Sequence, residues 1–258
     1  VHGLSIKPGK PAILGVINDT PVIGIPGYPV SAHIVFEEFV TPLLLKMNHR
    51  PKALQNTLIA TSTRRIVSSL KSKEYIRVKL GYIDNKYVAT PLARGAGMMM
   101  SVVKSDGYAL IEKNSEGVEA NEEMLVWLNK PIETIQKTIM AIGSHDVVMD
   151  VLNNLFEQTN VDYHISSVHV GSYAGLLALK RKESHLAMTH LLDESGTYNQ
   201  DVIKQLFSDE SMILIKGVKR IQGLIVKEGN PLKIHTIQDL LKYRFVNRQR
   251  GAGTRVLL

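Results

Sequence analysis

Two hydrophobic patterns meet at Gly24-Ile25-Pro26-Gly27-Tyr28-Pro29-Val30-Ser31-Ala32. Before this segment, residues 12–17 and 22–25 are short runs rich in β-branched side chains, joined by a polar turn, and they predict two strands. After it, apolar residues recur at helical spacing, and Ser31 is a candidate helix cap. The segment therefore predicts a strand, a Gly/Pro turn and a helix N-terminus, the arrangement in which α/β proteins present backbone N–H groups to an anion.

A second turn, Lys7-Pro8-Gly9-Lys10-Pro11, lies just before the first predicted strand. It places two ammonium groups close together on a stiff loop. They would repel each other unless an anion lay between them, which indicates phosphate as a partner. An exposed polar loop is the simpler interpretation of this turn taken alone. In the later segment, Pro26 and Pro29 fix φ on either side of Gly27 and remove two N–H donors, so that loop is rigid.

Together the two turns resemble the molybdopterin molybdenumtransferase family, whose eukaryotic relative is gephyrin. That family carries a KPGKP stretch followed, at similar separation, by GLPGNPVSA, and the resemblance covers residues 1–131. It implies an enzyme of molybdenum cofactor biosynthesis that inserts molybdate into adenylylated molybdopterin and releases AMP, assisted by Mg²⁺. It also implies a homodimer whose active site lies between the catalytic domain and the partner's small barrel. Tyr28 stands where the family has Asn, which leaves the ligand contact at that position open.

The resemblance also implies the site residues. Lys7 and Lys10 would be catalytic, holding the phosphates and the incoming oxyanion. The substrate-binding residues would be Pro26, Gly27, Pro29, Ser31, Arg77, Arg94 and Ser101. For Arg77 and Arg94, solvated charge at a strand edge is an equal alternative. The family's Mg²⁺ ligands would precede Val1, so we expect no metal site within these residues and no transferase activity from them alone.

The expected fold is multidomain, α/β and β. Residues 1–47 would be the end of an α/β catalytic domain, and residues 48–131 a small β-barrel domain. Residues 48–73 have the composition of a basic linker. Short strands separated by Gly and Asn turns are predicted beyond it at 75–80, 87–90, 108–111 and 124–128.

From residue 142 to 258, predicted strands and helices alternate, which implies a mostly parallel sheet whose ligand lies beyond the carboxyl ends of its strands. The section is similar to periplasmic-binding-protein-like domains, including LysR effector domains and molybdate-binding proteins. We expect its first lobe, 143–225, to be complete and its second to be truncated. Strands are predicted at 161–168, 186–189, 212–215, 221–226 and 245–246, and helices at 146–157, 172–182, 199–206 and 236–241.

Ser, Thr and Gly stand at several junctions of this section where a helix begins. Ser144, Ser172 and Thr254 are candidate oxyanion donors, with Arg250 as a charge partner. Simple helix capping is the alternative at each junction. The irregular spacing of His145, His169 and His190 favours core or capping histidines over a metal site.

Composition narrows the function classes further. The chain has 258 residues, a formal net charge of +7 and no cysteine, which excludes disulfides and thiolate sites. No apolar run is long enough to span a membrane. Residues 46–86 and 216–258 each carry ten Lys and Arg against two acidic residues. These blocks indicate anionic ligands, whereas nucleic acid is disfavoured because aromatic residues do not interleave with the basic ones.

Two functions remain. The first is the transferase with a fused domain that binds an oxyanion or small ligand. The second is a binding protein that senses molybdate or a pterin without transferase activity. The chain has no signal peptide at Val1 and ends within a helical pattern. We therefore expect a cytoplasmic protein and a fragment of a longer chain.

Overall fold

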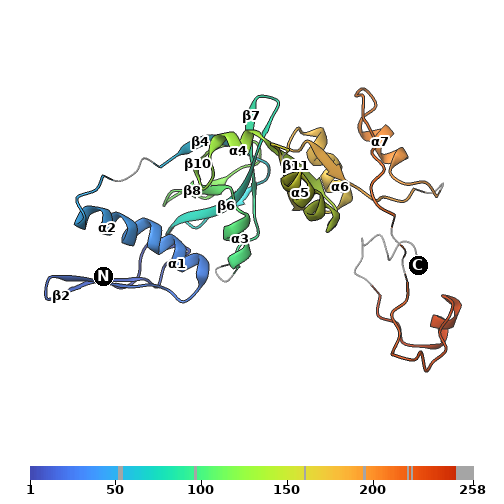
Figure 1. Ribbon diagram of the computed structural model, residues 1–258, viewed down its shortest axis with the longest axis horizontal. Coiled ribbons are helices and arrows are strands. Elements are labelled where there is room, and N and C mark those ends of the chain that lie inside the picture. Colours follow the sequence, from blue (N-terminus) through green and yellow to red (C-terminus); the bar gives the residue numbers. More distant parts are fainter. Residues whose placement is uncertain are drawn as a thin grey trace.

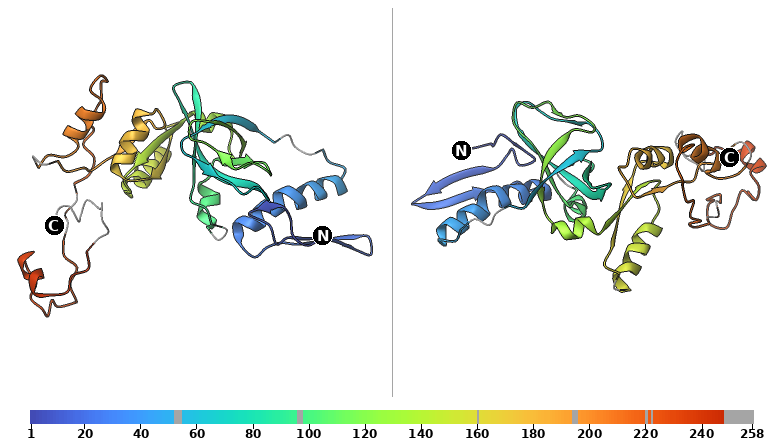
Figure 2. Two further views of the ribbon diagram at one scale, coloured as in Figure 1. Left: turned by 180° about the vertical axis from the view of Figure 1, so that it is seen from behind. Right: turned by 90° about the horizontal axis from the view of Figure 1, so that it is seen from above.

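The computed structural model describes residues 1–51, 55–95, 98–159, 161–193, 196–219, 221 and 223–247. The fold is multidomain and combines α/β and β architecture. Figure 1 shows a hairpin and helices at the N-terminal end, a small barrel in the middle and a small α/β layer beyond it. The other views agree that the segments after α7 run apart from the barrel (Figure 2).

The N-terminal part consists of a short strand, a hairpin and a nearly continuous helix. Strand β1 covers Ile6–Lys7, and the predicted hairpin is formed by β2 (Ile13–Ile17) and β3 (Thr20–Gly24). Its two-residue turn, Asn18-Asp19, has positive φ at both positions, as such tight hairpins require. The helical segments are α1 (Pro29–Val35), the π-helix η1 (Phe36–Val40) and α2 (Thr41–Met47).

The prediction that Ser31 caps the helix is wrong. Helix α1 begins at Pro29, Tyr28 is its N-cap, and Ser31 lies buried in the first turn. Proline fits the first helical position because its φ is already helical and its missing N–H would have had no partner there. The proline therefore moves the helix start two residues ahead of the serine.

Five strands close into the barrel: β4 (Thr57–Ser62), β6 (Lys73–Ile83), β7 (Lys86–Pro91), β8 (Gly107–Ile111) and β10 (Glu123–Leu128). They pair in the order β6-β7-β4-β10-β8, and β8 returns to β6. Val78, Leu80, Ala89, Ala109 and Val126 fill the interior. Strand β1 extends the sheet by pairing in parallel with the start of β6.

Four elements of the barrel region, β4, β5 (Ile66–Val67), α3 (Met99–Lys104) and β9 (Gly117–Val118), were not predicted from the sequence. Strand β4 lies inside the segment predicted to be a basic linker, and α3 interrupts the strands. The exposure of β4 alternates along its length, so its inner side chains join the barrel core. A small ribbon of β5 and β9 covers one end.

The α/β layer follows the short helix α4 (Ile132–Gln136). Its parallel sheet has the order β12-β11-β13, formed by β11 (Thr138–Gly143), β12 (His164–His169) and β13 (Leu186–Met188). Helix α5 (Val148–Gln158) packs on β12, and α6 (Ser172–Lys180) packs on β11 and β13. Helix α7 (Gln200–Leu206) packs on α6. The central strand β11 begins before the expected start of this section at 142.

The strands predicted at 212–215, 221–226 and 245–246 are wrong for the residues that the structure describes there. Only the 3₁₀-helix η2 (Gln238–Lys242) forms in this part. Ile213, Ile221 and Ile225 are 87, 95 and 102% exposed. A β-branched apolar run forms a strand only where a neighbouring strand takes its backbone groups, and no described strand lies beside these runs.

The barrel and the α/β layer share an apolar interface. Ile83 and Val88 from the β6–β7 hairpin pack with Met140, Ile142 and Val168. Gly81 permits this approach, because a Cβ there would lie 2.3 Å from Met140 Cγ. Within the described ranges, no helix is long and apolar enough to cross a membrane.

Candidate functional site

The two N-terminal turns are held together by apolar packing. Gly9, at φ +119°, lies so close to the helix that a Cβ would be 2.8 Å from Ile6 Cδ1 and 3.1 Å from Val35 Cγ2. The turn that carries Lys7 and Lys10 therefore rests on α1, the helix that the Gly/Pro turn begins. Tyr75 and Tyr108 of the barrel belong to the same cluster, so the barrel is fixed against both turns.

A buried carboxylate joins Lys7 to the barrel. Lys7 lies opposite Glu74 in the β1–β6 register, and its Nζ is 2.9 Å from Glu74 Oε1. Arg94 Nη1 is 3.3 Å from Oε2, and the Ser69 N–H donates to Oε1 at 3.1 Å. Glu74 is 1% exposed, whereas the Lys7 and Arg94 side chains are 55 and 45% exposed. Two predicted site residues, 87 positions apart, therefore meet on one carboxylate.

Glu74 was missed in the sequence. The available signal was its isolation, since Glu74 and Asp84 are the two acidic residues in the basic block 46–86. An acidic residue surrounded in sequence by many basic ones is expected to form an ion pair when it is buried, because an unpaired buried charge is costly.

Lys7 and Lys10 differ in their electrostatic surroundings. Glu74 neutralises the Lys7 ammonium, so relief of repulsion between the two lysines does not require an anion. Lys10 is exposed and forms no ion pair with the described residues. Lys10 is therefore the cation of this turn that is open to an anionic guest.

Arg77 is not the solvated strand-edge charge that was the alternative for it. It is 6% exposed, and its guanidinium donates to the carbonyl oxygens of Gly95 and Ala93, each at 3.1 Å. Burial lowers the pKa of Arg77. Arg77 therefore fixes the loop that carries Arg94. Ser101 is also buried, and its hydroxyl donates to the Met98 carbonyl within α3.

The Gly/Pro turn has an inner and an outer side. Pro26 and Ser31 are buried, whereas Gly27, Tyr28 and Pro29 are exposed. Helix α1 lies beside α3, the helix that carries Ser101. Helix α1, which begins at this turn, therefore contacts α3 of the barrel within one chain.

The candidate oxyanion residues of the α/β layer lie at the carboxyl edge of its parallel sheet. Ser144 follows β11 and donates its N–H to the Met188 carbonyl at 2.8 Å. Gly175 of α6 lies against the end of β11, where a Cβ would be 2.5 Å from the Gly143 Cα. This contact places the N-terminus of α6, at Ser172, beside Ser144.

Ser172 does not act as a helix cap. Gly171, at φ +94°, occupies the N-cap position. The Ser172 hydroxyl lies 3.1 Å from His190 Nδ1 and accepts the His190 N–H at 3.2 Å. These bonds engage the Ser172 hydroxyl, so Ser144 and the first N–H groups of α6 are the better candidate donors to an anion at this edge. Arg250 and Thr254 lie outside the described residues.

The histidines at this edge make contacts of their own. The rings of His145 and His169 have centroids 4.4 Å apart. Burial, and then the neighbouring His145, lower the pKa of His169. In the part of the chain that the structure describes, no three His, Asp or Glu side chains are grouped as metal ligands.

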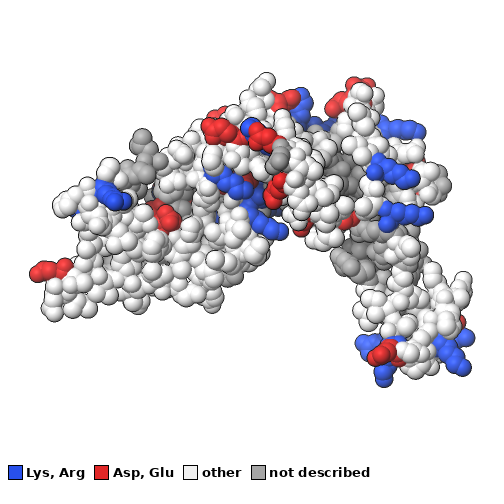
Figure 3. Space-filling view, in the orientation of Figure 1, with Lys and Arg blue, Asp and Glu red and all other residues white. Residues whose placement is uncertain are grey.

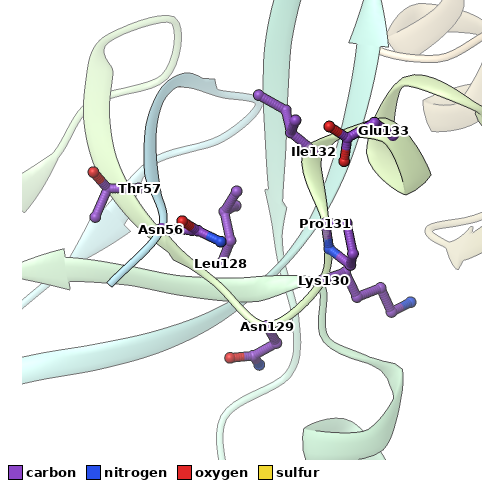
Figure 4. A pocket seen from close by; sticks show the side chains of 8 residues that line it. All are labelled: Asn56, Thr57, Leu128, Asn129, Lys130, Pro131, Ile132 and Glu133. Carbon is purple, nitrogen blue, oxygen red and sulfur yellow. The ribbon is translucent and has the colours of Figure 1, made fainter. Parts of the chain in front are cut away.

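Elsewhere, a cavity of about 460 Å³ opens where the barrel meets α4. It is lined by Asn56, Thr57, Leu128, Asn129, Lys130, Pro131, Ile132 and Glu133 (Figure 4). Lys130 points away from Asn56 and Leu128 in this view, and its ammonium pairs with Asp106 at 2.7 Å. No site residue expected from the sequence lines this cavity, so it lies apart from the candidate site.

Comparison with known families identifies two parts of the chain. Residues 60–128 match the MoeA C-terminal region (domain IV), and these residues form the closed five-stranded barrel. The barrel therefore resembles the MoeA C-terminal region. Residues 153–258 match the PBP superfamily domain. Both matches agree with the resemblances stated from the sequence.

Curated relatives resemble about half of the chain. The Methanocaldococcus jannaschii protein MJ0666, whose name assigns it to molybdopterin biosynthesis, is 36% identical over 130 residues, covering 50% of this chain and 30% of its own. The molybdopterin molybdenumtransferase of Haemophilus influenzae is 29% identical over 129 residues, covering 48 and 31%. YvgK of Bacillus subtilis is 33% identical over 120 residues, covering 45 and 39%.

Among solved structures, a molybdopterin biosynthesis MoeA protein from Pyrococcus horikoshii is 31% identical to this chain. The match covers 50% of this chain and 31% of that one, with a TM-score of 0.41. The chain spans about a third of the length of the curated relatives that it matches.

Proposed function

We propose that the chain belongs to an enzyme of molybdenum cofactor biosynthesis that inserts molybdate into adenylylated molybdopterin and releases AMP. The observation that carries this proposal is the meeting of Lys7 and Arg94 on Glu74. It links the lysine turn of the N-terminal part to the barrel, and it orders both cations around one buried carboxylate. Relatives named for molybdopterin biosynthesis support the same reaction.

The mechanism is electrostatic. Lys10 supplies an unpaired ammonium to the two anionic groups of the substrates. These groups are the phosphates of adenylylated molybdopterin and molybdate itself. Glu74 orients Lys7 and Arg94, and Arg77 orients the loop that carries Arg94. Cations fixed before the reaction stabilise developing negative charge without reorganisation. Pro26 and Pro29 restrict φ in the second loop on either side of Gly27.

The described residues do not fit Mg²⁺. Glu74, the buried carboxylate nearest to Lys7, already accepts from Lys7, Arg94 and the Ser69 N–H. Mg²⁺ prefers oxygen ligands that are free to coordinate in octahedral geometry. We therefore derive no step through Mg²⁺ from these residues.

For residues 142–258 we propose the binding of an oxyanion or another small anionic ligand. The Ser144 hydroxyl and the first N–H groups of α6 would donate to it, at an edge where parallel α/β sheets bind ligands. The match to the PBP superfamily supports a binding role. We further propose that the whole protein acts as a cytoplasmic homodimer, with small molecules rather than nucleic acid as partners.

A binding protein that senses molybdate or a pterin is the second candidate. The specific observation in its favour is that Glu74 already neutralises Lys7, so the lysine turn is stable without a substrate. In this function, ligand binding would reside in residues 142–258 alone.

The deciding experiment measures AMP release from adenylylated molybdopterin and molybdate by the full-length protein. We expect Lys10→Ala to reduce release by about tenfold or more, since a charge-assisted contact to phosphate is lost. Lys46→Ala is the matched control, because Lys46 lies on the exposed side of α2, away from the turns. Equal release by wild type and Lys10→Ala would contradict the role of Lys10. Absence of release from the wild type, with molybdate bound in calorimetry, would favour the sensor.

A further inference from the structure

A second cavity, distinct in position from the one in Figure 4, lies on the barrel. Its volume is about 320 Å³, and its lining residues are Arg64, Arg65, Ile66, Pro91, Leu92, Ala93 and Arg94. Two segments form it, the approach to β5 and the loop that follows β7. Three of the seven lining residues are arginines and none is acidic, which distinguishes it from the cavity at α4.

The three guanidinium groups have different partners. Arg94 is held by Glu74 and by the Val67 carbonyl. Arg65 pairs with Glu119 at 2.9 Å, in an exposed and therefore weak ion pair. Arg64 donates to the Pro91 carbonyl and pairs with no carboxylate of the described chain. Burial lowers the pKa of Arg64. Arg64 therefore has no counterion among the described residues at the wall of the cavity.

The backbone of the second wall adds a donor. The Ala93 carbonyl accepts a hydrogen bond from Arg77. In a planar trans peptide the following N–H points the opposite way, so the Arg94 N–H is directed away from Arg77. This N–H bonds to no described residue. It adds an oriented backbone donor near the arginines.

These features indicate which class of ligand the cavity would bind. Guanidinium groups bind phosphate and carboxylate oxygens in pairs, and phosphate best satisfies several donors that converge from different directions. A volume near the lower end of ligand pockets suits one or two phosphoryl groups. We propose that this three-arginine cavity of the barrel binds a phosphate or diphosphate group.

The proposal overlaps the proposed transferase site at Arg94 alone, so its test is made on Arg64. Calorimetry of the full chain at low ionic strength uses inorganic pyrophosphate and AMP as probes. Arg64→Gln removes the charge and retains a donor for the Pro91 carbonyl. We expect it to weaken binding by about tenfold, whereas Arg64→Lys loses less because the charge remains. Arg50→Ala, which removes an exposed arginine of the same basic block, should bind like wild type.

The outcomes separate the ligand sources. Arg64-dependent binding of pyrophosphate supports a free diphosphate, and Arg64-dependent binding of AMP supports a phosphate ester. Equal binding by wild type and Arg64→Gln, or binding of neither probe to the wild type, would overturn the proposal. Unfolding followed by circular dichroism verifies that each variant folds. If the full-length wild-type protein releases no AMP but binds pyrophosphate through Arg64, the proposed function is contradicted and the cavity is still a phosphate site.

Discussion

At the scale of single residues, Glu74 joins three separate segments of the chain. Its carboxylate is buried and accepts from three donors that come from β1, the loop before β6 and the loop after β7. The Lys7 and Arg94 side chains remain about half-exposed, so each can be hydrated if the carboxylate is lost. The stability cost of losing Glu74 is therefore smaller than for a fully buried pair.

We expect Glu74→Gln to lower the free energy of unfolding by about 2 kcal/mol, because hydrogen bonds to a charged acceptor are lost inside the protein. Denaturant titration followed by circular dichroism measures the change. Glu112→Gln is the control, since the Glu112 ion pair with Lys73 is exposed on the carboxylate side. An equal change in both variants would mean that Glu74 does not anchor the lysine turn.

At the scale of elements, the β6–β7 hairpin connects the two halves of the molecule. Strand β6 belongs to the closed barrel, and its far end packs on β11 of the parallel sheet. The contact between β6 and β11 depends on Gly81, which lies directly against the fully buried Met140. An element that serves two cores tolerates little change of volume at the contact.

Gly81→Ala should destabilise the protein by about 1–3 kcal/mol, because the added Cβ cannot fit beside Met140 without displacement. Combining it with Met140→Ala should cost less than the sum of the two single changes, since the smaller side chain makes room. Thermal or denaturant unfolding of the four proteins measures this coupling. Strictly additive effects would show that the two residues are not in contact.

The elements also show which parts of the fold were predictable. The β2–β3 hairpin, the later barrel strands and the helices at 148–158 and 172–180 follow from local periodicity and turn residues. Strand β11 was missed because a six-residue apolar run has the same pattern in a buried strand and in a buried helix. Strand β4 was missed because the charge of its neighbours outweighed a short alternating pattern.

At the scale of the whole molecule, charge is distributed in separate groups. Figure 3 shows Lys and Arg gathered over the middle of the molecule and over the region of α6 and α7, with acidic residues between them on this face. Separate groups suit several small anionic ligands better than one long polyanion.

The two halves are also joined by a histidine. His185 Nδ1 accepts the Met140 N–H at 3.0 Å, and its Nε2 lies 3.2 Å from the Tyr82 carbonyl of the barrel. This network requires the neutral ring, with the proton on Nε2. Nearby, Lys182 pairs with Asp84 across the same interface. Burial lowers the pKa of His185, an effect that the Tyr82 carbonyl opposes.

Because the folded pKa of His185 is lowered, the unfolded chain binds this proton more readily than the folded chain. The free energy of unfolding should therefore decrease as pH falls below about 6.5, the ordinary pKa of histidine. Denaturation at pH 7.5 and 5.5 measures the decrease, which His185→Gln should reduce. His235→Gln is the control, since His235 is exposed and lies outside this interface. Identical pH dependence in wild type and His185→Gln would contradict this role.

The sequence by itself determined the two rigid turns, the hairpin, the barrel strands of regular alternation and the alternating α/β section. These features depend on φ preferences and on side-chain periodicity over a few residues. Only the tertiary structure decided that Lys7 pairs with Glu74, that Arg77 is buried as a loop anchor and that β11 is the central strand. Such pairings join residues far apart in the chain, and they depend on strand register and packing, which no local pattern encodes.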